Sequence, residues 1–159
     1  RLVPLSVLQD LYAAAKEQDA DHPVMVVFDQ VATFGSASNP YAKRVADVAA
    51  FDIYPVNYQG YNPWIPRFLP SAAETARRVA PGAQVWLVAQ GFGEGALVEP
   101  TAGQFVQQVR DATEHGRVEG LVSFVWDRHY QDRFPYFAGD LKSSPELCKA
   151  LRQARRLIR

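Results

Sequence analysis

The chain has 159 residues and carries 17 Lys and Arg against 17 Asp and Glu. This length fits one domain with a sizeable core, and the balanced charge excludes the strongly basic surface that attracts nucleic acid or an acidic membrane. The single cysteine, Cys148, excludes an intrachain disulfide, and no apolar run reaches the roughly twenty residues of a membrane span. We therefore expect neither nucleic acid nor a membrane as a partner.

The first part of the chain alternates helices and strands. A capping-box pattern at residues 6–9 predicts a helix that ends near residue 21, and an apolar run then predicts a strand over 24–29. The Asn-Pro pair at 39–40 predicts the start of a short helix. A second apolar run predicts a strand over 49–54, which the following proline ends.

An aromatic and proline-rich segment over 57–70 comes next and shows little periodicity. It predicts a long loop, and loops of this length in compact domains tend to be functional. A second capping-box pattern at 71–74 predicts the next helix, which the Pro-Gly pair at 81–82 ends.

The last part of the chain repeats the strand–helix order twice. Apolar runs predict strands over 85–90 and 121–127. A capping box at 101–104 predicts a helix that ends near Gly116, and Ser144-Pro145 predicts the start of the final helix.

The four apolar runs lack strict polar alternation, which is typical of strands buried on both faces of a parallel sheet. Together they predict an α/β fold, with a parallel sheet of four βα units in one domain over 1–159. Two architectures fit: a small open sheet with helices on both faces, or the second half of a (β/α)8 TIM barrel. Long aromatic loops after the strands, no Gly-rich phosphate turn after the first strand and a chain that begins in a helix favour the half-barrel.

A half-barrel on its own would expose the apolar side chains of the barrel interior. We therefore expect a partner that covers them, either the missing N-terminal half-barrel or another chain. An open sheet with two covered faces would need no such partner.

Short motifs at the predicted strand ends resemble those of a known family. They are the segments 49–55 (AAFDIYP), 85–93 (VWLVAQGFG) and 119–127 (EGLVSFVWD), with a Pro-Thr pair at 100–101. These segments resemble the last strands of bacterial glycoside-hydrolase-like TIM barrels. In that family a D-x-Y-P segment ends strand six, a W-x-x-x-Q-x-F-G segment ends strand seven, and strand eight ends in Trp. The likeness covers nearly the whole chain and implies a barrel that handles carbohydrate.

The resemblance also implies where catalytic carboxylates would lie. In the large retaining group of these hydrolases the acid ends strand four, which would precede this chain, and the nucleophile is a Glu at the end of strand seven. The strand-seven position here holds Gln90, which cannot be a nucleophile. Glu94 lies four residues further on, as a third candidate catalytic group or as a solvated loop glutamate.

Glycosidases generally need two carboxyl groups. Asp52 follows an apolar run and precedes Tyr54 by two residues, so both side chains share one face of the strand. Burial there would raise the pKa of Asp52, as a general acid requires. Asp29 ends the neighbouring strand and completes the predicted catalytic pair, although either carboxylate could instead bind loop backbone amides.

Sugar rings stack on flat aromatic side chains, and sugar hydroxyls hydrogen-bond to carboxylates and amides. The predicted aromatic platforms are Tyr54, Trp64 and Trp126, and the predicted polar contacts are Gln90 and Asp127. The alternative for Trp126 is a core position under the last helix, and for Trp64 a packing position within its loop.

Asp127, His129 and Asp132 have a spacing that metal ligands use in loops, but nothing else completes such a site, so we expect no metal and no cofactor. The sequence thus predicts a carbohydrate-active protein, a glycoside hydrolase that cleaves O-glycosidic bonds by carboxylate acid/base chemistry. The alternative is a non-catalytic glycan-binding or scaffold barrel, which the amide at Gln90 supports.

Overall fold

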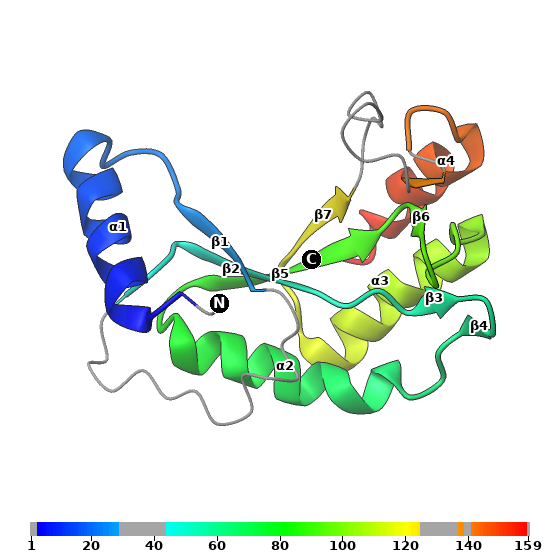
Figure 1. The fold of residues 1–159 in the computed structure, drawn as a ribbon, viewed down its shortest axis with the longest axis horizontal. Helices are drawn as coiled ribbons and strands as arrows, with labels where there is room; N and C mark the ends of the chain where they lie inside the picture. The colour runs from blue at the N-terminus through cyan, green and yellow to red at the C-terminus, as the bar shows by residue number, and fades with distance from the viewer. Residues whose placement is uncertain (1–2, 29–43, 125–136, 139–140, 159) are drawn as a thin grey trace.

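The structure, a computed structural model, describes residues 3–28, 44–124, 137–138 and 141–158 (Figure 1). Its central sheet has four parallel strands in the order β1-β2-β5-β7. They are β1 (Met25–Phe28), β2 (Val48–Asp52), β5 (Gln84–Gln90) and β7 (Gly120–Phe124). The predicted α/β fold with a parallel sheet of four strands is confirmed, and each strand overlaps its predicted run.

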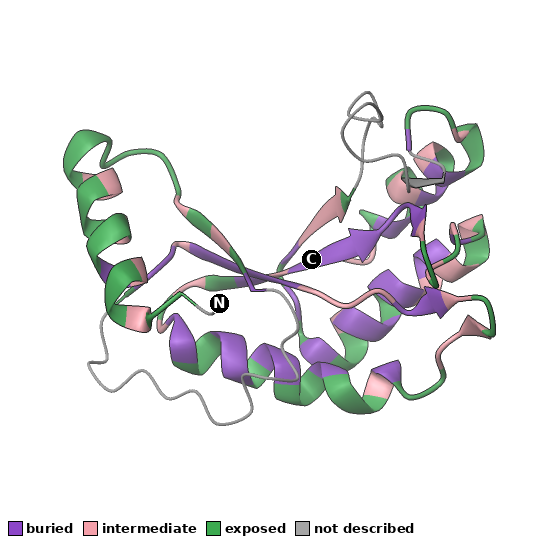
Figure 2. Ribbon diagram, viewed as in Figure 1, coloured by how far each residue is buried: buried purple, intermediate pink, exposed green. Residues whose placement is uncertain are grey.

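The described residues also form four helices. They are α1 (Leu5–Gln18), α2 (Ile65–Val79), α3 (Ala102–Gly116) and α4 (Pro145–Ala154). Helix α2 packs against β2 and β5, α3 packs against β5, and α4 packs on α3. Helix α1 stands beside β1 at one end of the sheet and is mostly exposed, whereas β2 and β5 are mostly buried (Figures 1 and 2).

Strand alternation gives the sheet two different faces. One face packs on the helices through apolar residues of the main core, namely Phe28, Ala49, Phe51, Val85, Leu87 and Ala89. The residues that alternate with these form the other face, here called the open face. Figure 1 shows α2 and α3 together on one side of the sheet. Met25, Val27 and Phe124 on the open face are 39%, 51% and 40% exposed, so this face is apolar and only partly covered.

Helix α2 begins earlier than the sequence predicts. The predicted start at the capping box of 71–74 is wrong, because the helix begins at Ile65 and contains Pro70 in its interior. Pro66 lies in the first turn, where a missing N–H costs nothing, but Pro70 removes one helical hydrogen bond. The first turns bury Ile65 and Leu69 against the core, and this packing outweighs the loss.

The other helix starts agree with the sequence to different degrees. The capping box of α3 is confirmed, because the Thr101 side chain accepts from Gln104 N at 3.3 Å and Gln104 Oε1 accepts from Thr101 N at 2.9 Å. Helix α4 begins at Pro145, as predicted. Helix α1 follows Pro4 without a side-chain cap, so the capping box predicted at 6–9 is wrong although the helix is present. The helix predicted at 39–40 lies outside the described residues.

The predicted long loop over 57–70 is also wrong. Strands β3 (Val56–Asn57) and β4 (Gly60–Tyr61) form a hairpin there, and Gly60 has a φ of 99° in its turn. The 92–98 segment lies against this hairpin, since Val98 N donates to Val56 O at 3.2 Å and Tyr58 N to Ala96 O at 3.3 Å. The 92–98 segment contains β6 (Gly93–Glu94), which pairs with β8 (Phe137–Ala138). The hairpin of 56–61 and the 92–98 segment are here called the rim.

A polar cluster holds α1 to the N-terminal ends of the strands. Asp47, just before β2, accepts a hydrogen bond from Val24 N at 2.8 Å and one from the Tyr12 hydroxyl at 2.9 Å. Its carboxylate also pairs with Lys16 at 2.9 Å and Arg44 at 3.2 Å. Partial burial alone would raise the pKa of Asp47, but the hydrogen bonds from Val24, Lys16 and Tyr12 outweigh it and lower the pKa from 3.8 to about 2.

Replacement of Asp47 tests this cluster. D47N should lower the free energy of unfolding by about 1–2 kcal/mol at pH 7. Because the folded-state pKa lies below the unfolded one, the charged group stabilises the fold above about pH 4, and this contribution is lost as the pH falls toward 2. The difference between wild type and D47N should therefore shrink over that range in urea titrations. D10N, at an exposed position of α1, is the control; a constant difference at all pH values would contradict the prediction.

Gly120 tests the packing of the open face. It pairs with Trp86, and a Cβ atom at Gly120 would overlap the Trp86 indole ring. G120A should therefore destabilise the protein by about 1–3 kcal/mol, as overpacking does. G103A is the matched control, because Gly103 lies within α3 with room for a methyl group and should be neutral or slightly stabilising. Chemical denaturation measures both; equal effects would show that Trp86 does not lie over Gly120.

Candidate functional site

The C-terminal ends of the parallel strands meet at one edge of the sheet, where α/β proteins place their sites. Asp52 is the last residue of β2 and pairs with Val88 of β5, on the open face. It is half-buried, and its Oδ1 atom is inaccessible to solvent. Tyr54 follows two residues later and is also half-buried. The predicted pair of Asp52 and Tyr54 therefore lies at the expected edge.

Three aromatic rings form a row at this edge. The Tyr54 and Phe92 rings meet edge to face, with centroids 5.0 Å apart and planes at 86°. Phe92 meets Phe124 in the same way, at 5.3 Å and 89°. Phe92 is buried, whereas Tyr54 is half-buried and Phe124 is 40% exposed. This aromatic row, Tyr54–Phe92–Phe124, joins the ends of β2, β5 and β7.

Gln90, the last residue of β5, is fully buried beneath the rim. Its Oε1 accepts from Val56 N at 2.9 Å. Its Nε2 lies within hydrogen-bond distance of three carbonyl oxygens, those of Val98 at 2.9 Å, Val56 at 3.0 Å and Phe92 at 3.1 Å. The side-chain amide is therefore used to hold the rim, and the predicted contact of Gln90 with sugar is not open in this arrangement.

Gln108 of helix α3 binds the backbone of Gln90 at the end of β5. Gln108 Oε1 accepts from Gln90 N at 2.9 Å, and Gln108 Nε2 donates to Gln90 O at 2.9 Å. The two buried glutamines are thus joined by a reciprocal pair of hydrogen bonds, which satisfies the backbone at the end of β5.

A second contact between α3 and the rim involves Tyr61 of β4. Its hydroxyl donates to Asp111 Oδ2 at 2.7 Å, while Gln107 Nε2 donates to Asp111 Oδ1 at 2.7 Å. Burial and this hydrogen bond raise the pKa of Tyr61 above its ordinary value, so the hydroxyl stays protonated and serves as a donor. Asp111 is itself buried.

Two other predicted residues lie in or near the rim. Glu94 is half-buried in β6, and its backbone forms a closed turn with Leu97 through hydrogen bonds of 3.0 and 2.8 Å. Trp64 precedes α2 and is 54% exposed, with the Arg67 guanidinium 4.4 Å above its ring. One ring face of Trp64 is thus occupied by a cation, and the roles predicted for both residues stay predictions.

The remaining predicted residues are Asp29, Trp126 and Asp127. All three lie outside the described residues, so their predicted roles in catalysis and sugar binding stay predictions. Asp29 directly follows β1 in the sequence.

The sequence analysis missed Phe92, Phe124 and Gln108. Phe92 is in the Q-x-F-G segment that carries the family resemblance, so its position relative to Gln90 was a usable signal. Phe124 lies within the run predicted over 121–127, but the predicted strand end at Asp127 selected Trp126 and Asp127 instead. Gln108 gives no such signal, because a polar residue on a helix is ordinarily exposed.

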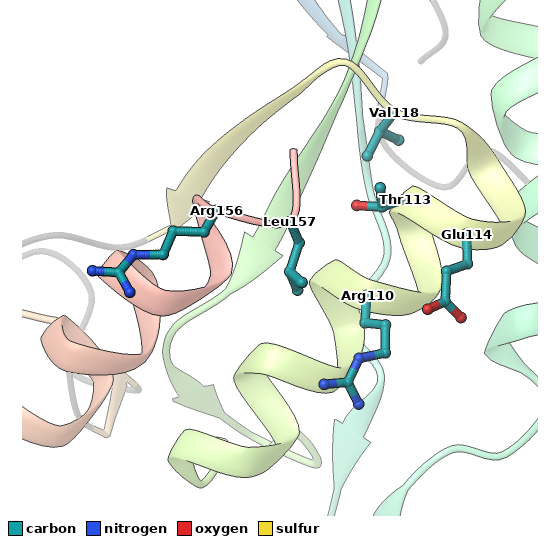
Figure 3. Close-up of a pocket in the computed structure, with 6 residues that line it drawn as sticks. All are labelled: Arg110, Thr113, Glu114, Val118, Arg156 and Leu157. Carbon is teal, nitrogen blue, oxygen red and sulfur yellow. The ribbon is translucent and has the colours of Figure 1, made fainter. Parts of the chain in front are cut away.

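A pocket of about 340 Å³ lies elsewhere, in the helix layer (Figure 3). Its lining comes from α3 and from the segments after α3 and α4, and comprises Arg110, Thr113, Glu114, Val118, Arg156 and Leu157. Val118 precedes β7, so the pocket lies at the N-terminal side of that strand, whereas Asp52 ends β2. Barrel and open-sheet enzymes place their chemistry at the C-terminal side, and we therefore do not assign the site to this pocket.

In the described part of the chain, no group of three or more His, Cys, Asp or Glu side chains has the arrangement of a metal site. Over the same residues, no helix is both long enough and apolar enough to span a membrane.

Comparisons with known proteins do not identify the family. No protein-family model matches the chain, and a search of curated proteins gives no match. The site is therefore interpreted from its own geometry.

The surroundings of Gln90 give a direct test. In Q90E a carboxylate would replace the amide donor that faces three carbonyl oxygens. We expect a loss of about 3 kcal/mol or more in the free energy of unfolding at pH 7. Burial should raise the pKa of the new Glu, so the protonated form is favoured in the folded state and the loss should grow as the pH rises.

Gln104 offers a matched control for the same chemical change. Its Oε1 only accepts a hydrogen bond, from Thr101 N, and a glutamate serves a capping box equally well. Q104E should therefore leave stability almost unchanged in chemical denaturation at pH 5 and pH 8. A Q90E protein as stable as Q104E would show that the amide does not hold the rim.

Proposed function

We propose that the chain is the second half of a (β/α)8 barrel that handles carbohydrate at the C-terminal edge of its sheet. Support for the half-barrel comes from the order β1-β2-β5-β7, which follows the chain. Right-handed crossovers in that order keep the connecting helices on one face, whereas helices on both faces require the order to reverse. The common side of α2 and α3, which connect β2 to β5 and β5 to β7, agrees with this reasoning (Figure 1).

The open face gives a second reason for the half-barrel. Met25 and Val27 are exposed there, although apolar strand residues are ordinarily buried. In a closed barrel, strands from a preceding half or from another chain would continue the sheet beyond β1 and β7. The open face would then form the barrel interior, which is a packed core.

The observation that carries the carbohydrate assignment is that Asp52 ends β2 two residues before Tyr54, the first ring of the aromatic row. The Tyr54 ring contacts the Phe92 ring, which in turn contacts the Phe124 ring. Aromatic rings bind the C–H faces of a sugar, and a carboxylate binds its hydroxyls. The two kinds of group together favour a saccharide over a purely apolar ligand or a phosphate.

Within this proposal the reaction is hydrolysis of an O-glycosidic bond. Asp52 is the first catalytic carboxylate, and its partly buried position suits a group that must hold a proton for the leaving oxygen. Asp29 is the proposed second carboxylate, and Glu94 is the third candidate catalytic carboxylate. The proposed sugar contacts are Tyr54, Trp64, Trp126 and Asp127, to which the structure adds Phe124.

A non-catalytic glycan-binding barrel is the second candidate. It uses the same aromatic row and needs no second carboxylate. A single carboxylate, Asp52 at the end of β2, is enough for this function. Saccharide binding by calorimetry without release of product would select this function.

Replacement of Asp52 tests the hydrolase. In the intact protein, D52N should lower kcat on the best substrate of an oligosaccharide panel by a factor of about 100 or more, the usual contribution of a general acid. The variant should keep the wild-type melting temperature within a few degrees, since the amide has nearly the same shape. D10N is the control with unchanged activity. Retained turnover in D52N would contradict the assignment.

A further inference from the structure

Buried polar side chains concentrate at the rim. Among the described residues, five polar or charged side chains are buried, and Gln90, Gln108 and Asp111 are three of them. Burial of a polar group is costly unless its hydrogen bonds are made, and a satisfied network in return fixes one geometry. The concentration of such groups in one place indicates that the geometry of the rim is held closely.

A chain of contacts leads from helix α3 to the aromatic row. Gln108 binds the backbone N–H and C=O of Gln90. The Gln90 amide binds the carbonyl of Phe92 at 3.1 Å, and the Phe92 ring touches both Tyr54 and Phe124. The position of Phe92 therefore depends on this hydrogen bond, and Tyr54 and Phe124 are linked to it through their ring contacts with Phe92.

We infer that Gln108 and Gln90 are positioning residues that set the aromatic row for a saccharide ligand. This inference rests on the proposed function, because it takes the row as the sugar-binding surface. Neither glutamine touches the ligand: Gln90 is fully buried under the rim, and Gln108 is buried in α3. Their effect is on the spacing of Tyr54, Phe92 and Phe124 and on the rim that covers them.

The reason that positioning matters here is geometric. Edge-to-face rings hold their relative angles only while their backbones are fixed, and a displacement of about 1 Å in a binding site has large effects on recognition. Without Gln108, the N–H and C=O of Gln90 would lose their partners at the end of β5. The end of β5 would then shift until these two groups form hydrogen bonds with water. The Phe92 ring would shift with it.

The test uses three variants of the intact protein. Q108L removes both hydrogen bonds to Gln90 and keeps an apolar side chain of similar size. Q108E keeps the acceptor for Gln90 N and, at neutral pH, loses the donor to Gln90 O. T75V is the matched control, since Thr75 is a buried polar residue of α2 that is remote in the sequence from the rim and bonds Arg78 at 3.0 Å.

Two readouts separate positioning from simple destabilisation. Calorimetry measures affinity for cellohexaose, xylohexaose, mannohexaose, laminarihexaose and chitohexaose. Amide hydrogen exchange follows the N–H of Val56, which donates to Gln90 Oε1. All measurements are made well below the melting temperature of the least stable variant, so that every protein is folded.

We expect Q108L to bind the best hexaose about tenfold more weakly than wild type or worse, and to exchange the Val56 N–H at least about tenfold faster. T75V should match wild type in both. Q108E should resemble Q108L at pH 8 and recover toward wild type at pH 5. A protonated carboxyl can again donate to Gln90 O, and burial raises the pKa of this Glu.

The outcomes distinguish the positioning role of Gln108 from the proposed carbohydrate function. Wild-type affinity and wild-type Val56 exchange in Q108L would overturn the positioning role, and so would equal losses in T75V and Q108L. Faster Val56 exchange in Q108L, together with no binding of any hexaose by wild type, would overturn the proposed carbohydrate function and with it the saccharide part of this inference. Recovery of Q108E at pH 5 supports positioning, because a merely structural defect would not follow the protonation of one side chain.

Discussion

The buried amide of Gln90 is the interaction on which the C-terminal edge depends. A primary amide offers two donor hydrogens and one acceptor oxygen, and here it meets backbone groups of residues far from it in the chain, up to 34 positions away. Because an unsatisfied amide in this position would be costly, the rim has one favourable arrangement. The hairpin after β2 and the segment after β5 are therefore fixed relative to each other and to the sheet. The geometry of the aromatic row depends on that arrangement.

The two edges of the sheet use polar groups for different purposes. At the N-terminal edge, Asp47 accepts hydrogen bonds from a backbone N–H and a hydroxyl and pairs with two cations. This cluster holds α1 to the sheet. At the C-terminal edge, the buried amides of Gln90 and Gln108 lie under the rim, and the buried Asp111 accepts a hydrogen bond from Tyr61 of the rim. The first arrangement stabilises the fold, and the second leaves aromatic and carboxylate groups facing the edge where parallel sheets bind ligands.

The sequence predicted what depends on local pattern. The four strands are apolar runs, and the capping box at Thr101 is a short-range hydrogen-bond motif, so both were visible. The start of α2 was not, since the packing of Ile65 and Leu69 outweighs the prolines, and packing is a property of the folded chain. The position of Asp52 at a strand end was predictable because apolar runs mark the strands. The role of Gln108 depends on a contact 18 positions away in sequence, and no periodicity reveals it.

The amide at Gln90 also bears on whether catalysis is present. In the sequence it stands where the retaining hydrolases that the strand-end motifs resemble have a glutamate, and this supported the non-catalytic alternative. Its surroundings give a different reason for the amide, because three carbonyl oxygens lie around Nε2 and a carboxylate could not donate to them. The amide is therefore required by the rim, and its presence is no evidence that an ancestral nucleophile was removed. The choice between hydrolase and glycan-binding barrel then rests on Asp52 and its partner carboxylate, not on Gln90.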